Sequence, residues 1–165
     1  MSRKYRHNFV FPKKTSLDQF FVNLNTRITS LRASKKLALA FDKMADDLQN
    51  NIIVVPPLLR SEVKYDAISN HPKPFILAYL TIPSMADELI SWHQKNPTTV
   101  IHCFCDRFQS QETIKYAPNL TFHKINGENF LSMMKQCTAL ATTAGFESVC
   151  EAMSLGKPVF MIPVP

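Results

Sequence analysis

A serine and a glutamate one helical turn apart, Ser148 and Glu151, are the residues best placed to do chemistry in this sequence. They follow Gly145, and a glycine after a strand permits the sharp turn that exposes the first backbone N–H groups of a helix. Those groups and the helix dipole attract a phosphate or a diphosphate. Ser148 would add a hydroxyl, and the Glu151 carboxylate would accept hydrogen bonds from two ribose hydroxyls. The pattern is consistent with a nucleotide site, but Ser-x-x-Glu is also the spacing of a capping box.

The segments around these residues predict a strand, a turn, a helix and a second strand. Residues 139–143 are small, apolar and β-branched, as in a buried strand. Apolar residues at 146, 149, 150 and 153 predict a helix over 146–155 that packs by that face. Gly156 in the left-handed conformation would end the helix, and Pro158 prevents its continuation. Residues 159–162 form the next strand.

The alternation of strands and helices extends back to residue 75. Strands are predicted over 75–80, 98–105 and 119–122, and helices over 85–94 and 130–137. The joins are short, so the sheet should be parallel with right-handed crossovers. The expected fold class is therefore α/β, a doubly wound parallel sheet of Rossmann-like type.

Such sheets bind ligands at the carboxyl ends of their strands, often where the strand order switches. Thr143 lies at one such end, directly before the turn at Gly145. Thr81 and Ser84 lie at another, after the strand over 75–80. Ser84 is also expected to cap the helix that follows it.

Residues 1–55 are predicted to form one helix and two short strands. The apolar positions of residues 17–31 follow a helical period, and strands are predicted over 37–41 and 52–55. Basic residues concentrate in 1–36. A basic amphipathic helix can lie on an anionic membrane, but the commoner arrangement is a helix packed by one face with a solvated basic end.

Composition narrows the classes of function. The 165 residues make one domain or slightly more, and 45% hydrophobic content is enough for a core. The net charge of +6 favours an acidic partner. We expect a cytoplasmic protein, with the inner membrane surface as the place of any peripheral contact, because we find no signal peptide or membrane-spanning run.

The cysteines and histidines suggest packing rather than catalysis. None of the four cysteines forms a C-x-x-C pair, which predicts reduced thiols in the core. Cys103 and Cys105 follow His102 in the pattern His-Cys-x-Cys, and we interpret this as strand alternation rather than a metal site. His93 is expected on a helix surface and His102 packed in a strand, and neither is assigned a catalytic role.

The spacing of Gly145, Ser148, Glu151, Gly156 and Pro158 resembles the C-terminal half of GT-B-fold nucleotide-sugar glycosyltransferases. Peptidoglycan lipid-I N-acetylglucosaminyltransferases and UDP-glucuronosyltransferase-like proteins are the most similar types. The resemblance implies that residues 54–165 are a donor-binding domain, truncated at its C-terminus. Residues 1–53 would be the tail of an otherwise missing acceptor domain, or a linker. The acceptor domain would be missing or on another chain, and the fragment would be inactive alone.

The resemblance also implies a reaction: a hexose moves from a UDP-sugar to an acceptor hydroxyl, with neither metal nor other cofactor. Glu151 would bind the ribose, and the loop 123–126 would read the uracil. The family's glycine-rich loop is replaced here by residues 80–84, where a hydroxyl would substitute. The residues implied in binding are Gly145, Phe146, Glu147, Ser148, Glu151, Thr143, Lys124, Ile125, Thr81 and Ser84.

Two other functions stay open. A UDP-sugar epimerase of the same fold would need catalytic carboxylates and a histidine across the cleft. A non-enzymatic α/β interaction module would use its basic face, but no aromatic–basic motif for single strands appears, and we expect no nucleic-acid partner. The catalytic base, the donor sugar and the acceptor are not identified. Apolar surface on residues 1–36 could support a homodimer.

Overall fold

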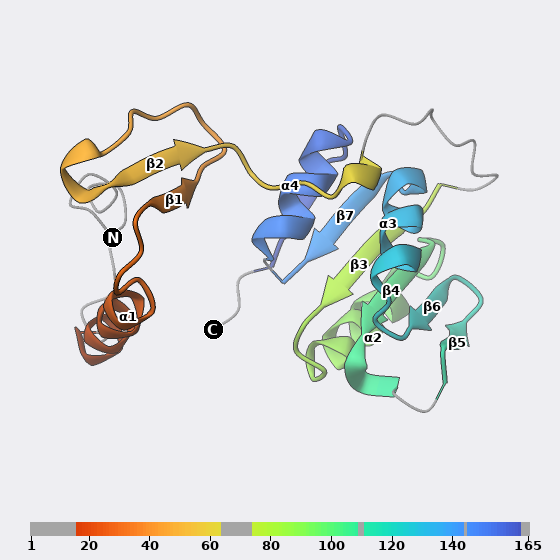
Figure 1. Cartoon of the computed structure of the whole chain (residues 1–165). Coiled ribbons are helices and arrows are strands. Elements are labelled where there is room, and N and C mark those ends of the chain that lie inside the picture. The colour runs from red at the N-terminus through yellow and green to blue at the C-terminus, as the bar shows by residue number, and fades with distance from the viewer. Residues whose placement is uncertain (1–15, 64–73, 109–110, 144, 163–165) are drawn as a thin grey trace. The chain divides into compact units, whose positions relative to one another are not determined.

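The computed structural model describes residues 16–63, 74–108, 111–143 and 145–162. It divides the chain into two compact units, Met1–Pro57 and Leu58–Pro165 (Figure 1). The boundary follows Pro56-Pro57, where two consecutive prolines prevent β2 from continuing. That the first unit belongs to an acceptor domain stays a prediction.

Among the residues that the structure describes, the first unit contains one α-helix and a small parallel sheet. Helix α1 spans Ser16–Thr29, and strands β1 (Lys36–Leu39) and β2 (Ile52–Val55) pair in parallel, with Lys36 opposite Ile52. A 3-10 turn over Leu48–Asn50 precedes β2. The helix and both strands confirm the sequence prediction within two residues at most boundaries.

The second unit is a six-stranded sheet with three α-helices. Its strands are β3 (Ile76–Leu80), β4 (Ile101–Cys105), β5 (Thr113–Ala117), β6 (Leu120–His123), β7 (Ala139–Thr142) and β8 (Val159–Met161). Its helices are α2 (Met85–Lys95), α3 (Gly127–Gln136) and α4 (Phe146–Ser154), with 3-10 turns over Ser61–Val63 and Asp106–Phe108. Every helix predicted in this unit is present, so the α/β class is confirmed.

One strand runs against the prediction of a fully parallel sheet. β5, which the sequence did not predict, pairs antiparallel with β6. Only Pro118 and Asn119 separate the two strands, and two residues can close a hairpin but cannot carry a parallel crossover. The sheet is therefore parallel from β6 to β8, with an antiparallel edge at β5.

The strand order is β5-β6-β4-β3-β7-β8, and it places a switch point between β3 and β7. From β3 the chain moves outward through β4 to β6, then returns to the other side of β3 to form β7 and β8. Loops after β3 and after β7 therefore diverge to opposite faces from adjacent strand ends. Open α/β sheets bind their ligands in this kind of crevice.

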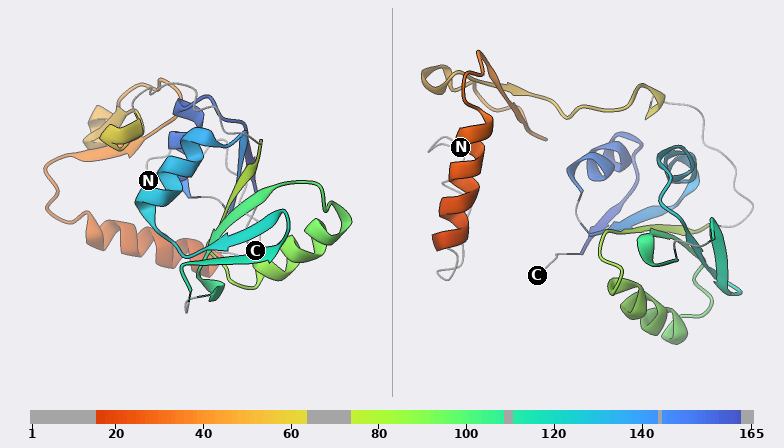
Figure 2. Two further views of the ribbon diagram at one scale, coloured as in Figure 1. Left: turned by 90° about the vertical axis from the view of Figure 1, so that its right-hand side faces the viewer. Right: turned by 60° about the horizontal axis from the view of Figure 1, so that its bottom comes forward.

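Helices cover both faces of the sheet. Ala86 and Ile90 of α2 pack with Ala78 of β3 on one face. Phe130 of α3 and Ala152 of α4 share the opposite face with other apolar residues. The right-hand view in Figure 2 shows α3 and α4 above the sheet and α2 below it. Alternate residues of each buried strand supply the two cores, as the pleat requires.

His93 is buried rather than on the surface, so that prediction is wrong. It lies in the last turn of α2 with 4% of its surface exposed, and its Nε2 is 3.1 Å from the Thr99 carbonyl oxygen. His93 shares the buried face of α2 with Ala86 and Ile90, at spacings of four and three residues, and the Thr99 carbonyl in the turn before β4 supplies its polar contact. His93 therefore has a structural contact that holds this turn.

Candidate functional site

Two threonines join the loops at the switch point. The backbone N–H of Thr81 donates to Oγ1 of Thr143 at 3.0 Å, and the two hydroxyl oxygens are 2.9 Å apart. The N–H of Thr143 donates to the carbonyl of Tyr79 at 3.1 Å. Thr143 is buried while Thr81 is exposed. The two predicted site residues are thus brought together at adjacent strand ends.

The start of α4 leaves its first backbone N–H groups without a side-chain cap. Gly145 is the N-cap residue, in extended conformation, and no side-chain hydrogen bond caps the helix in the part of the chain that is described. The first four N–H groups of a helix have no intrahelical acceptor. The start of α4 therefore presents donors and the positive end of a dipole.

The capping-box interpretation of Ser148 is wrong. Ser148 is the third residue of α4 rather than its N-cap, and its Oγ donates to the Gly145 carbonyl oxygen at 3.1 Å. Gly145 has φ −101° and ψ 128°, which any residue can adopt. Its lack of a side chain serves close approach instead, since a Cβ there would lie 3.3 Å from the Ser148 Oγ.

The buried face of α4 also differs from the predicted one. Val149 and Cys150 are buried as expected, but Phe146 is 40% exposed and Met153 is 55% exposed. The helix packs instead by its middle, where Ser148, Glu151 and Ala152 are buried as well. A glutamate therefore occupies a place in the buried face, and burial of its charge requires a partner.

Arg60 is that partner, and the sequence analysis missed it. Its Nε donates to Oε1 of Glu151 at 2.5 Å and its Nη2 to Oε2 at 2.7 Å, a two-pronged ion pair across 91 residues. The Glu151 side chain is 5% exposed and that of Arg60 is 39% exposed. The hydrogen bonds to Glu151 raise the pKa of Arg60 above its ordinary value, although partial burial opposes this. Arg60 is therefore charged.

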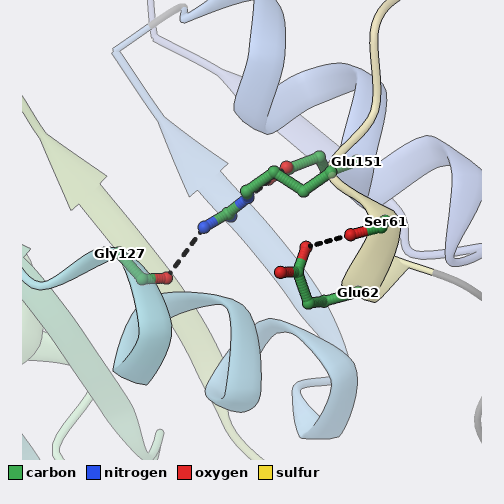
Figure 3. A network of polar contacts seen from close by, with 5 residues as sticks. Ser61, Glu62, Gly127 and Glu151 are labelled. Atoms are coloured by element: carbon green, nitrogen blue, oxygen red, sulfur yellow. Dashed lines mark hydrogen bonds and ion pairs between the residues drawn. The ribbon is translucent and has the colours of Figure 1, made fainter.

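Arg60 also reaches the start of α3. Its Nη1 donates to the carbonyl oxygen of Gly127 at 3.0 Å (Figure 3). One guanidinium thus links α4 to the loop that leads into α3. The sequence offered no local signal for this contact, because Glu151 lies outside the apolar face predicted for 146–155 and Arg60 is 91 residues away.

The loop between β6 and α3 is fixed at both ends. The N–H of Lys124 donates to the carbonyl of Glu112 at 2.9 Å. Asn126 caps α3, and its Oδ1 accepts from the N–H groups of Glu128 at 3.1 Å and Asn129 at 3.0 Å. Lys124 and Ile125 between these anchors are exposed. Both predicted residues therefore lie at the carboxyl end of β6, and Asn126 separates them from Gly127, whose carbonyl oxygen Arg60 binds.

A histidine pair lies under this loop. Nδ1 of His102 is 2.9 Å from Nε2 of His123, and the His123 ring stacks on Phe104 with centroids 4.9 Å apart. Burial, with repulsion from His102, lowers the pKa of His123 to about 4. His123 is therefore uncharged at neutral pH.

The cysteines beside His102 lie on the other face of the sheet. Cys103 and Cys105 belong to the core under α2, whereas His102 meets His123. This confirms the interpretation of the segment as strand alternation. All four cysteines are unpaired thiols and buried, as predicted.

Ser84 does not cap α2. It has helical backbone angles, φ −65° and ψ −26°, and its side chain makes no capping hydrogen bond. The N–H groups of Met85, Ala86 and Asp87 donate to the carbonyls of Ile82, Pro83 and Ser84, so a turn of helix already precedes α2. Ser84 is exposed on the loop after β3, the loop that also contains Thr81.

The sequence matches the family model described as glycosyl transferase family 1 over residues 4–165. Comparison with curated proteins gave no match. The family match covers nearly the whole chain, and it does not distinguish the lipid-I transferase type from the UDP-glucuronosyltransferase type.

Proposed function

Because the chain belongs to glycosyl transferase family 1 and is thus a glycosyl-transfer enzyme by family, we propose that its second unit binds the sugar donor and that the donor is a UDP-hexose. The observation that carries this proposal is the buried carboxylate of Glu151, held by Arg60 beside the uncapped start of α4. Helix α4, which contains Glu151, follows the carboxyl end of β7 in a doubly wound sheet, and such folds bind nucleotides at that edge.

Glu151 can bind a ribose while it remains paired with Arg60. A carboxylate offers about four lone-pair positions, and the two hydrogen bonds from Arg60 use two of them. The others would accept hydrogen bonds from the 2′ and 3′ hydroxyls of a ribose. Arg60 fixes the orientation of the carboxylate in advance, which lowers the entropy lost on binding.

The diphosphate would lie at the start of α4. The N–H groups of Phe146, Glu147 and Ser148 would donate to its oxygens, and the helix end contributes about half a positive charge. Arg60 uses three of its five N–H donors on Glu151 and Gly127, which leaves two donors for a phosphate oxygen. The hydroxyls of Thr81, Thr143 and Ser84 would border the place where the loops after β3 and β7 meet.

This arrangement favours departure of UDP. In the transfer, an acceptor oxygen forms a bond to the anomeric carbon as the bond to the β-phosphate oxygen breaks. The electron pair of the broken bond stays with UDP, whose added charge the helix start and Arg60 would stabilise. Donors held in place before the reaction can lower such a barrier by several kcal/mol, about 3 kcal/mol for one donor. The acceptor's proton goes to a base that we do not assign.

The uracil ring of the donor would lie on the loop 123–126. Ile125, 37% exposed, offers an apolar surface and backbone groups for a pyrimidine. The neighbouring His123 is uncharged at neutral pH and stacks on Phe104, so it holds the start of the loop rigid. A short loop anchored at both ends suits a small uracil ring better than a purine.

Calorimetric titration tests the donor proposal. UDP should bind at least about tenfold more tightly than ADP or CMP, and Glu151→Gln should weaken UDP binding by about tenfold or more, since a hydrogen bond to a charged group is lost. Glu88→Gln, which changes an exposed carboxylate on α2, is the matched control and should stay within about twofold.

The thermal midpoint of each variant separates a binding effect from unfolding, because breaking the Arg60 pair also costs stability. Thr81→Val provides a second variant that leaves this pair intact. Equal affinity for all three nucleotides, or no loss in folded Glu151→Gln, would contradict the proposal.

A further inference from the structure

We propose that α1 and the basic segment after it form a membrane-binding element that lies in the surface of an anionic bilayer. At 100° per residue, five of the six large apolar side chains of α1 lie in one stripe about 100° wide, and Val22 lies outside it. The stripe consists of Leu17, Phe20, Phe21, Leu24 and Ile28. Their exposed fractions lie between 41% and 71%, so the other described residues of the first unit leave this face uncovered.

Positive charge adjoins the stripe. Arg27 lies in the last turn of α1, and Arg32, Lys35 and Lys36 follow it, all exposed. In sequence, residues 1–36 contain nine Lys and Arg against Asp18 alone, while the other 129 residues contain ten Lys and Arg against twelve Asp and Glu. The net positive charge of the protein therefore comes entirely from the segment that contains α1.

The combination fits a lipid surface better than a protein groove. Either a lipid surface or a protein groove would bury the apolar stripe. A protein groove, however, does not explain an excess of eight positive charges on one segment. Anionic headgroups attract each nearby Lys or Arg, by about fivefold in partitioning per residue. Phenylalanine and leucine on one face with basic residues beside them are typical of helices that lie at the headgroup boundary.

The element would lie on the bilayer rather than cross it. α1 has 14 residues, and a crossing helix needs about 20. None of the helices in the described residues is long and apolar enough to span a membrane. The inference rests on α1 and the basic residues adjacent to it, and it does not depend on the nucleotide site.

Flotation of the full chain with lipid vesicles tests it. We expect binding to vesicles of phosphatidylcholine with about one quarter phosphatidylglycerol, little binding to phosphatidylcholine alone, and release in about 0.5 M NaCl. Phe20→Ser with Phe21→Ser should reduce the bound fraction at least about tenfold. The control pair Leu48→Ser with Leu58→Ser, at 78% and 74% exposure, should leave it unchanged.

Charge is tested by a second matched pair. Arg32, Lys35 and Lys36 changed together to Gln should weaken binding by about a hundredfold at low salt. The same change at Lys43, Lys95 and Lys115, which are exposed elsewhere, should alter it much less. If both triple variants weaken binding equally, attraction is non-specific and α1 is not the element.

A reporter guards against misfolded variants. With Trp92→Phe and Phe20→Trp, anionic vesicles should shift the tryptophan emission to shorter wavelength. An unshifted emission would overturn the proposal. Equal binding to neutral vesicles would also overturn it. So would sedimentation that shows a dimer held by α1 and unable to bind vesicles, because the stripe would then contact a second copy of the chain.

Discussion

The hydroxyl of Thr142 is a buried polar group without a hydrogen-bond partner among the described residues. Thr142 is fully buried in β7, opposite Tyr79 of β3 and Met161 of β8. An unpaired buried hydroxyl costs about 1–3 kcal/mol. Thr142→Val should therefore raise the free energy of unfolding by about 1 kcal/mol in urea titration.

Thr138→Val is the matched control. The Thr138 hydroxyl donates to the carbonyl of Phe75 at 2.8 Å, so its loss should lower stability by about 1 kcal/mol. If Thr142→Val destabilises as much as Thr138→Val, the Thr142 hydroxyl has a partner, such as a bound water.

His123 should make the protein less stable as the pH falls. Its pKa is about 4 when folded and about 6.5 when unfolded, so between these values the unfolded chain binds more protons. The stabilising contribution is complete above pH 6.5 and is lost as the pH falls towards 4. Partial exposure of His123 makes the effect smaller than the full shift implies.

Urea midpoints measured from pH 7.5 to 4.5 check this expectation. His123→Gln should give a flatter curve than wild type, because glutamine does not titrate. Parallel curves for the two proteins would show that the His123 pKa does not change on folding.

At this scale, sequence reasoning found the residues that local spacing defines. Ser148 and Glu151 lie on one helix, one turn apart, so their proximity could be predicted. Arg60 could not be found this way, because its contact with Glu151 spans 91 residues and depends on the packing of a non-helical segment. His93 was misplaced because the buried face of α2, which consists of Ala86, Ile90 and His93, was not identified from the sequence.

Among the elements, the end of α4 depends on Gly156. Its φ of +68° is in the left-handed region, and the N–H groups of Gly156 and Lys157 donate to the carbonyls of Met153 and Ala152, both at 2.9 Å. This is the Schellman pattern that glycine commonly completes. Its conformation was predicted from the sequence and is confirmed.

Gly156→Ala should lower the free energy of unfolding by about 1 kcal/mol through backbone strain alone, since nothing lies within 4 Å of an added Cβ. Gly127→Ala at the start of α3, where a Cβ would meet only Arg60 Nη1 at 3.5 Å, should not destabilise the protein. Equal losses in the two variants would contradict the strain argument.

The elements that were predicted well are those with strong periodicity and clear stops. β7, α4 and β8 follow the predicted order because Gly156 and Pro158 separate them. β5 was missed because its mostly exposed side chains lack the apolar run of a buried strand. Its antiparallel pairing follows from a two-residue connection, and that connection can be recognised only after both strands have been predicted.

For the whole molecule, the doubly wound order could be predicted as a class, but the neighbours of each strand could not. The pairing of β3 with β7 brings Thr81 and Thr143 together, and periodicity contains no information on that pairing. Long-range pairing in a parallel sheet is decided by the packing of all its layers.

A further expectation concerns divalent cations. The charge stabilisation proposed for UDP comes from the helix start and Arg60, so the dissociation constant for UDP should change by less than about twofold after treatment with EDTA. Titrations with and without added Mg²⁺ check this. A tenfold loss on chelation that Mg²⁺ restores would show that a cation takes part in donor binding.

Amide NMR can show whether the start of α4 holds the diphosphate of the donor. The chain would be titrated with UDP and, separately, with uridine, which lacks the phosphates. We expect UDP to shift the amide resonances of Phe146, Glu147 and Ser148, whereas uridine should shift those around Ile125 and leave the α4 amides in place. Unmoved α4 amides with saturating UDP, or equal shifts from uridine, would contradict this expectation.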